Sequence, residues 1–115
     1  MKRLAATLAL TLAAALAPLH AATLETRSYT VEITPLCGEA VTDCEQFAYA
    51  GTHNRTGNRI NMTGKPGMRS CPPGCDPTGY QFYNRNVSYF VGRDGWLIVQ
   101  DGRKTVLREL GTWRN

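Results

Sequence analysis

The stretch YQFYNRNVSYFVGRDGWLIVQDG, residues 80–102, decides the fold class of this 115-residue chain. Its runs rich in aromatic and β-branched residues are 80–83, 87–91 and 96–100. The gaps between them hold Asn-Arg-Asn at 84–86 and Arg-Asp-Gly at 93–95, and Asp-Gly is among the strongest short-range hairpin signals. The stretch therefore predicts three antiparallel strands joined by tight turns.

The same rhythm extends in both directions along the chain. Val31 and Ile33 alternate with polar residues, and Ile60 and Met62 do the same, which is the period of a strand with one buried face. The further predicted strands are 28–34, 47–52, 59–63 and 104–110. Residues 64–78 are rich in proline and glycine and are predicted to form a loop.

About seven short strands with no convincing helix between them indicate an all-β fold. We expect a small antiparallel meander that closes into a barrel or sandwich in order to bury one face of the sheet. Trp96, Trp113 and the tyrosines are expected to supply much of the core.

The N-terminus has the pattern of a secretory signal peptide. Lys2 and Arg3 precede an uncharged, alanine- and leucine-rich run of about 14 residues, shorter than the roughly 20 that a spanning helix needs. We expect residues 1–21 to be cleaved, leaving one β domain at 22–115 in the periplasm or the medium. That domain keeps 11 basic and 9 acidic residues. Its net charge of +2 is too small and too dispersed to favour nucleic acid.

Four cysteines follow the signal, at Cys37, Cys44, Cys71 and Cys75. The second pair encloses Pro-Pro-Gly, which precludes the helix that normally activates a redox thiol, and six residues separate the first pair. In an oxidising compartment they are expected to form structural disulfides rather than a redox or metal site. The favoured pairing is Cys37–Cys44 with Cys71–Cys75. The pairing Cys37–Cys75 with Cys44–Cys71 stays open, because loop-closure entropy does not decide between them.

No catalytic set can be assembled from the remaining residues. His53 is the only histidine after the signal, and no Gly-x-Ser-x-Gly is present. Asp94, Asp101 and Glu109 lie in the C-terminal hairpins, but the two aspartates each precede a glycine and are explained by turn formation. The sequence predicts a non-enzyme without a cofactor or metal.

Arginine is the most suggestive residue type. Nine of the 11 basic residues after the signal are arginine. The candidates for partner binding, each in or beside a predicted turn, are Arg55, Arg59, Arg85 and Arg93. Arginine suits bidentate recognition of carboxylates, and several turns are expected to share one end of the barrel. The competing interpretation is that these residues are solvated surface cations.

Positions that match a known group of proteins are spread over nearly all of residues 22–115. They are Tyr29-Thr30-Val31; Cys44 with Phe47, Tyr49 and Gly51; Thr56-Gly57 with Ile60 and Gly64; Gly79-Tyr80, Phe82 and Asn84; Tyr89 and Val91; Asp94-Gly95, Leu97 and Val99; and Gly111-Thr112-Trp113. Through them the chain resembles a group of small exported proteins, mostly from proteobacteria, of unassigned function. A looser likeness is to the periplasmic inhibitors of C-type lysozyme. The Ser-Gly-Ser-x-x-Tyr loop of those inhibitors is absent here, so this second likeness concerns architecture and compartment only.

We therefore expect a non-catalytic protein-binding module, such as a lysozyme or hydrolase inhibitor or a toxin immunity protein. Its partner would be a secreted or periplasmic protein, with no nucleic acid and no stable membrane anchor after cleavage. The alternative is a structural or envelope-associated, glycan-binding protein. Its sugar-stacking strip would consist of Tyr80, Tyr83, Tyr89 and Trp96.

Overall fold

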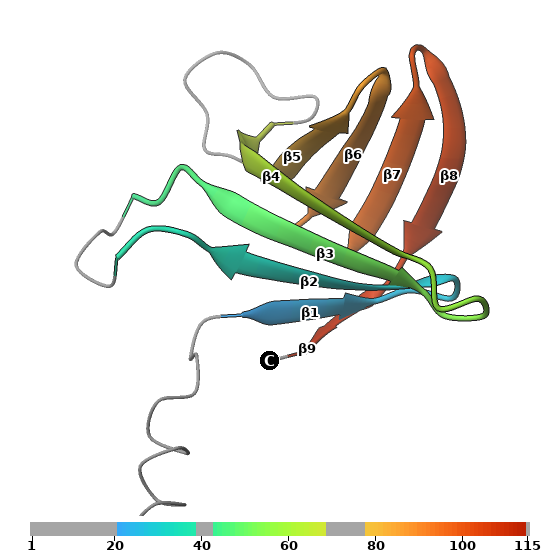
Figure 1. Cartoon of the computed structure of the whole chain (residues 1–115), viewed down its shortest axis with the longest axis horizontal. Helices are drawn as coiled ribbons and strands as arrows, with labels where there is room; N and C mark the ends of the chain where they lie inside the picture. The colour runs from blue at the N-terminus through green and yellow to red at the C-terminus, as the bar shows by residue number, and fades with distance from the viewer. Residues whose placement is uncertain (1–20, 39–42, 69–77, 115) are drawn as a thin grey trace, which may run out of the picture.

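The computed structural model describes residues 21–38, 43–68 and 78–114, and this part of the chain consists of strands and their connections (Figure 1). Its nine strands are β1 (Ala22–Glu25), β2 (Tyr29–Pro35), β3 (Phe47–His53), β4 (Arg59–Gly67), β5 (Gly79–Asn84), β6 (Val87–Gly92), β7 (Trp96–Asp101), β8 (Lys104–Leu110) and β9 (Thr112–Arg114). All pairs are antiparallel, in the order β8-β7-β6-β5-β4-β3-β2-β1-β9. The predicted all-β meander is confirmed as a nearly closed, barrel-like sheet, with two more described strands than expected.

The long strand β4 carries the sheet from one side of the barrel to the other (Figure 1). Residues 59–64 pair with β3, and residues 64–67 pair with β5. The prediction of a loop from Gly64 onward is therefore wrong for residues 64–67. An added Cβ at Gly64 would contact the carbonyl oxygen of Gln81 and the ring of Phe82, so the glycine allows β4 and β5 to approach closely.

The sheet is brought near closure by two strands that the sequence did not reveal, β1 and β9. Thr23 pairs with Arg114 and Glu25 with Thr112, and the Arg114 guanidinium lies 3.0 Å from the Glu25 carboxylate. Strands of three and four residues show too little alternation to be recognised. They form because their partners lie beside them in space.

A carboxylate joins the far end of β8 to the β1–β2 turn. The two oxygens of Glu109 accept hydrogen bonds from the Thr26 hydroxyl at 2.8 Å, the Ser28 N–H at 3.0 Å and the Ser28 hydroxyl at 2.6 Å. The same turn is held from its other side by Asn54, whose amide donates to the carbonyl oxygens of Thr26 and Arg27 at 3.2 Å each. The β1–β2 turn is thus fixed between β8 and the β3–β4 hairpin.

The core lies inside the barrel and follows the predicted alternation. Its buried members are Leu24, Val31, Ile33, Tyr49, Phe82, Val91, Leu97 and Val99. Ile60 and Met62 pack against this cluster, as expected. Phe90 and Ile98 face each other across β6 and β7 and are buried on the opposite face of the sheet, which the simple alternation did not predict.

The two tryptophans differ in their surroundings, so the expectation that both contribute to the core is only half right. Trp113 packs against the core, lies 6.4 Å from the ring of Tyr80 and donates its indole N–H to the carbonyl oxygen of Gly92. Trp96 is half-buried on the outer face of β7, where the Arg108 guanidinium lies 4.2 Å from its ring centre. This contact is a cation–π interaction at the surface.

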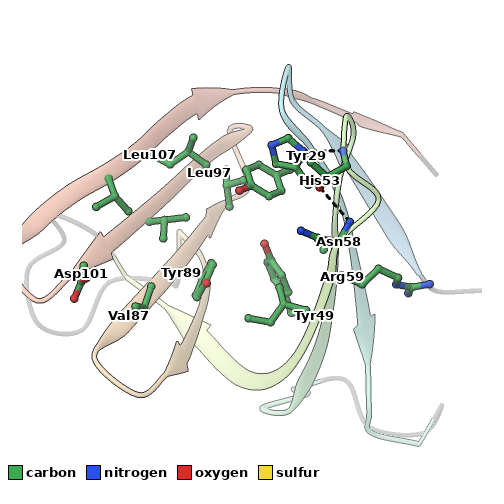
Figure 2. A pocket seen from close by; sticks show the side chains of 15 residues that line it. Tyr29, Tyr49, His53, Asn58, Arg59, Val87, Tyr89, Leu97, Asp101 and Leu107 are labelled. Atoms are coloured by element: carbon green, nitrogen blue, oxygen red, sulfur yellow. Dashed lines mark hydrogen bonds between the residues drawn. The ribbon is translucent and has the colours of Figure 1, made fainter.

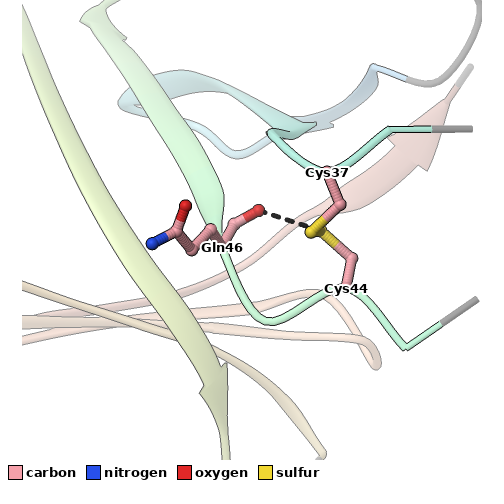
Figure 3. The surroundings of a disulfide bond; sticks show 3 residues. All are labelled: Cys37, Cys44 and Gln46. Atoms are coloured by element: carbon pink, nitrogen blue, oxygen red, sulfur yellow. Dashed lines mark hydrogen bonds between the residues drawn. A yellow bond between two sulfur atoms is a disulfide. The ribbon is translucent and has the colours of Figure 1, made fainter. Parts of the chain in front are cut away.

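The connection between β2 and β3 is closed by the Cys37–Cys44 disulfide (Figure 3). The Leu36 N–H donates to the carbonyl oxygen of Gln46 at 2.9 Å, and Cys44 Sγ lies 3.1 Å from that same oxygen. The favoured pairing of the first two cysteines is confirmed, and the cross-linked alternative is wrong. Cys71 and Cys75 lie outside the described residues.

Candidate functional site

A cavity of about 490 Å³ opens between two groups of strands (Figure 2). One wall comes from β2, β3, β4 and the β3–β4 turn, with Tyr29, Tyr49, Gly51, His53, Thr56, Asn58, Arg59 and Ile60. The other comes from β6, β7 and β8, with Val87, Tyr89, Leu97, Val99, Asp101, Val106 and Leu107. Most of these side chains are aliphatic or aromatic, so the barrel interior continues outward as an apolar cavity.

Tyr49 is the central polar group of this cavity. It is only 2% exposed, and its ring packs 5.1 Å from Phe82 and 5.6 Å from Tyr89, measured between ring centres. An added Cβ at Gly51 would lie 2.6 Å from Tyr49 Cε1 and 2.8 Å from its hydroxyl oxygen. The absence of a side chain at Gly51 therefore gives the Tyr49 phenol room to lie over its own strand.

The phenols of Tyr49 and Tyr89 keep their protons at neutral pH. Burial raises the pKa of Tyr49 far above its ordinary value, and the nearby phenols of Tyr89 and Tyr29 raise it further. Burial and the neighbouring Tyr29 also raise the pKa of Tyr89. Each phenol can thus donate one hydrogen bond and accept others.

His53, the last residue of β3, lies at the mouth of the cavity and is half-buried. Its ring is perpendicular to that of Tyr29, with 5.0 Å between the ring centres. Its Nδ1 accepts hydrogen bonds from the N–H groups of Arg55 and Thr56, at 3.2 and 3.3 Å. An accepting Nδ1 places the proton of the neutral imidazole on Nε2.

The four candidate arginines are exposed but do not gather at one place. Arg59 lines the cavity mouth, and Arg55 lies in the adjoining β3–β4 turn. Arg85 lies in the β5–β6 turn with a φ of 59°, while Arg93 lies in the β6–β7 turn at the other end of β6. Of the four, only Arg59 belongs to the cavity lining, and Arg55 lies in the turn next to it.

The three carboxylates of the C-terminal hairpins are separated by the fold. Asp94 accepts a hydrogen bond from the Trp96 N–H at 3.3 Å within its turn, while Asp101 is at the opposite end of β7. Glu109 is engaged with the β1–β2 turn. Asp94, Asp101 and Glu109 thus lie at three different places and do not form a pair.

The four aromatics of the proposed sugar-stacking strip also separate. Tyr80 packs against Phe47 and Trp113 and Tyr89 lies in the cavity, while Tyr83 is 67% exposed and Trp96 contacts Arg108. A sugar-stacking strip needs its rings side by side on one surface, and these four rings have different surroundings.

The cavity itself was not predicted from the sequence. Tyr29, Tyr49 and Tyr89 belong to three different strands. In the alternating pattern of its strand, each occupies a position that is typical of an ordinary core residue. Only the pairing of the strands shows that these three rings surround one space.

Fold and cavity together define a small barrel-like β domain with a cavity open at one side. No family model, curated protein or solved structure matches the chain. Residues 21–38, 43–68 and 78–114 contain no helix long and apolar enough to cross a membrane. The same residues contain no group of three or more His, Cys, Asp or Glu side chains arranged to hold a metal ion.

Proposed function

We propose that this protein is an exported, non-catalytic binding protein whose binding centre is the cavity between β2–β4 and β6–β8. The observation that carries the proposal is the cavity's size and lining. Its volume of about 490 Å³ and its apolar walls with a few polar groups are typical of small-molecule sites.

Two features support export to the periplasm or the medium. The first 21 residues have the pattern of a signal peptide, and the Cys37–Cys44 disulfide is of a kind that persists in oxidising compartments. A stapled barrel with a preformed cavity also suits ligand capture, because little conformational entropy is lost on binding.

Closing the mouth of the cavity should abolish binding of an apolar probe. Val106 lines the cavity and is 52% exposed, so Val106→Trp places a bulky ring at the mouth with little cost to the core. We expect its affinity for N-phenyl-1-naphthylamine, measured by fluorescence titration, to fall at least ~10-fold, because the ring occupies part of a preformed site.

The matched control is Leu110→Trp, on the same strand, 57% exposed and outside the cavity lining. It should bind the probe like the unmodified protein. Failure of the folded, unmodified protein to bind the probe saturably would overturn the proposed function.

A second candidate function is recognition of a secreted or periplasmic protein, such as a lysozyme-type hydrolase or a toxin. The observation that favours it is the pair of exposed arginines, Arg55 and Arg59, on the hairpin beside the cavity mouth. In the described residues the ion pair found is Arg114–Glu25, so neither guanidinium is paired within this part of the chain. Both are accessible to carboxylates of a partner.

Charge reversal tests this second candidate. The double variant Arg55→Glu/Arg59→Glu should weaken binding to a C-type lysozyme or related hydrolase by ~10-fold or more, because it replaces attraction by repulsion. The variant Arg85→Glu/Arg93→Glu, with the same change in charge elsewhere, should bind normally. Equal affinities of the unmodified protein and both variants in biolayer interferometry, or no binding to any hydrolase at micromolar concentration, would remove this candidate.

A further inference from the structure

The Tyr49 side chain is largely buried, and its hydroxyl faces the cavity. The residue is 2% exposed, and no described residue donates to or accepts from its hydroxyl. In the described part of the chain, no fully buried side-chain oxygen or nitrogen lacks a partner. The unused capacity of Tyr49 is therefore directed into the cavity, where a ligand can reach it.

The phenols of Tyr29 and Tyr89 face the same space. Figure 2 shows the three rings converging on the cavity from β2, β3 and β6. Within the described residues, their hydroxyls likewise have no hydrogen-bond partner. The three hydroxyls share this space with aliphatic side chains such as Leu97 and Val99. The remaining lining is polar and consists of His53, Thr56, Asn58, Arg59 and Asp101.

Packing alone does not account for the Tyr49 hydroxyl. The neighbouring Phe82 shows that an unsubstituted ring fills this part of the core, since it is 0% exposed and packs against Tyr49. A phenylalanine at position 49 would fill the same space without placing a hydroxyl at the wall of a largely apolar cavity, where a polar group that lacks a hydrogen bond costs free energy. The hydroxyl instead has a place beside Gly51, where an added Cβ would be 2.8 Å from it.

The charges around the cavity favour an uncharged ligand. Its charged lining residues are Arg59 and Asp101, one of each sign, and both are exposed at the mouth. Figure 2 shows the Arg59 side chain directed away from the cavity. A carboxylate or an amine beside Tyr49 would be desolvated without a charge of opposite sign, which is strongly unfavourable.

We propose that the cavity binds an uncharged, largely apolar small molecule that presents one hydrogen-bond-accepting oxygen, such as a ketone, to the phenols of Tyr49, Tyr89 and Tyr29. This inference rests on the proposed function and names the ligand class of the same site. The apolar body lies against Leu97 and Val99, and the oxygen accepts a hydrogen bond from Tyr49.

Three ligands of similar shape test the inference. They are 2-acetylnaphthalene, with a neutral acceptor oxygen; 2-ethylnaphthalene, with none; and 2-naphthoate, with a charge. Competition against N-phenyl-1-naphthylamine gives their affinities for the full mature chain. We expect the ketone to bind about 5- to 10-fold more tightly than the hydrocarbon, as one hydrogen bond to a buried donor provides, and the carboxylate to bind most weakly.

Tyr49→Phe should remove the preference for the ketone by lowering its affinity to that of the hydrocarbon, while hydrocarbon binding stays unchanged. The control Tyr83→Phe removes a hydroxyl from a residue that is 67% exposed and outside the cavity, and it should keep the preference. Loss of ketone and hydrocarbon binding together in Tyr49→Phe would indicate a structural role for the hydroxyl and overturn the inference.

The ligand series in the unmodified protein provides a separate test that does not depend on a variant. If the hydrocarbon or the carboxylate binds as tightly as the ketone, the ligand class is wrong although the cavity binds small molecules. If neither the probe nor any of the three naphthalenes binds, the proposed function itself fails.

Discussion

Replacing Phe82 with alanine is expected to lower the free energy of unfolding by about 3–5 kcal/mol, the cost of removing a large aromatic side chain from a packed core. Phe82 is 0% exposed and is the largest fully buried side chain of the described residues. Its ring packs against Tyr49 from β3 and lies beside Gly64 of β4, so it joins both sides of the barrel. Small domains have total stabilities of roughly 5–15 kcal/mol. The substitution should therefore bring the protein close to unfolding at moderate temperature.

The measurement is urea denaturation followed by tryptophan fluorescence. Tyr83→Ala is the control, because Tyr83 is the next residue of β5 but is 67% exposed. Its effect should stay within about 0.5 kcal/mol, as for surface positions generally. Comparable losses in the two variants would show that the core is not centred on Phe82.

The second large effect is expected at Glu109, and it should depend on pH. Burial by itself would raise the pKa of this carboxyl, but hydrogen bonds from the Ser28 hydroxyl, the Thr26 hydroxyl and the Ser28 N–H outweigh it, helped by the charge of Arg27. The result is a pKa below the ordinary value. The ionised carboxylate therefore stabilises the folded state. Glu109→Gln should cost about 1–2 kcal/mol at neutral pH, a figure kept modest because Glu109 is partly exposed to solvent.

The direction of the pH dependence follows from the lowered pKa. Above the ordinary carboxyl value of 4.5, Glu109 is ionised in folded and unfolded chains, and its contribution to stability is complete. As the pH falls through the lower folded-state pKa, the carboxylate is protonated and the contribution is lost. The difference in unfolding free energy between the unmodified protein and Glu109→Gln should thus be constant near neutrality and shrink in acid.

Urea denaturation over a descending pH series tests this expectation. Glu45→Gln, at an exposed position between β2 and β3, is the matched control for the loss of one carboxylate. A Glu109→Gln difference that persists unchanged in acid would mean that the side-chain shape, rather than its charge, holds the β1–β2 turn.

Local signals in the sequence were sufficient for most of the sheet. Val31 and Ile33 alternate with polar residues along one strand, and Arg-Asp-Gly at 93–95 forms a turn. Both patterns involve only neighbouring residues, and both are found as predicted. The strand at 64–67 was missed because Gly64 and Pro66 resemble loop residues unless the close approach of β5 is known. The difference is physical, since alternation and turns are local whereas close approach depends on a partner strand.

The candidate site was less accessible to sequence reasoning than the fold. Its three phenols come from positions 29, 49 and 89, and nothing in their spacing distinguishes a cavity wall from a filled core. Glu109 presented the same difficulty, because its partners Thr26 and Ser28 lie 83 and 81 residues away. Such contacts become visible only when the barrel closes.

The pairing of β9 with β1 also bears on the order in which the strand pairs can form when the chain emerges N-terminus first. Seven of the eight described strand pairs join neighbours in the sequence, so each can form as soon as its second strand has emerged. The pair β1–β9 joins the earliest strand to the latest, and one edge of β1 stays without its strand partner until residues 112–114 arrive. The sheet therefore remains an open ribbon until residues 112–114 are present, and the pair β1–β9 is the last that can form.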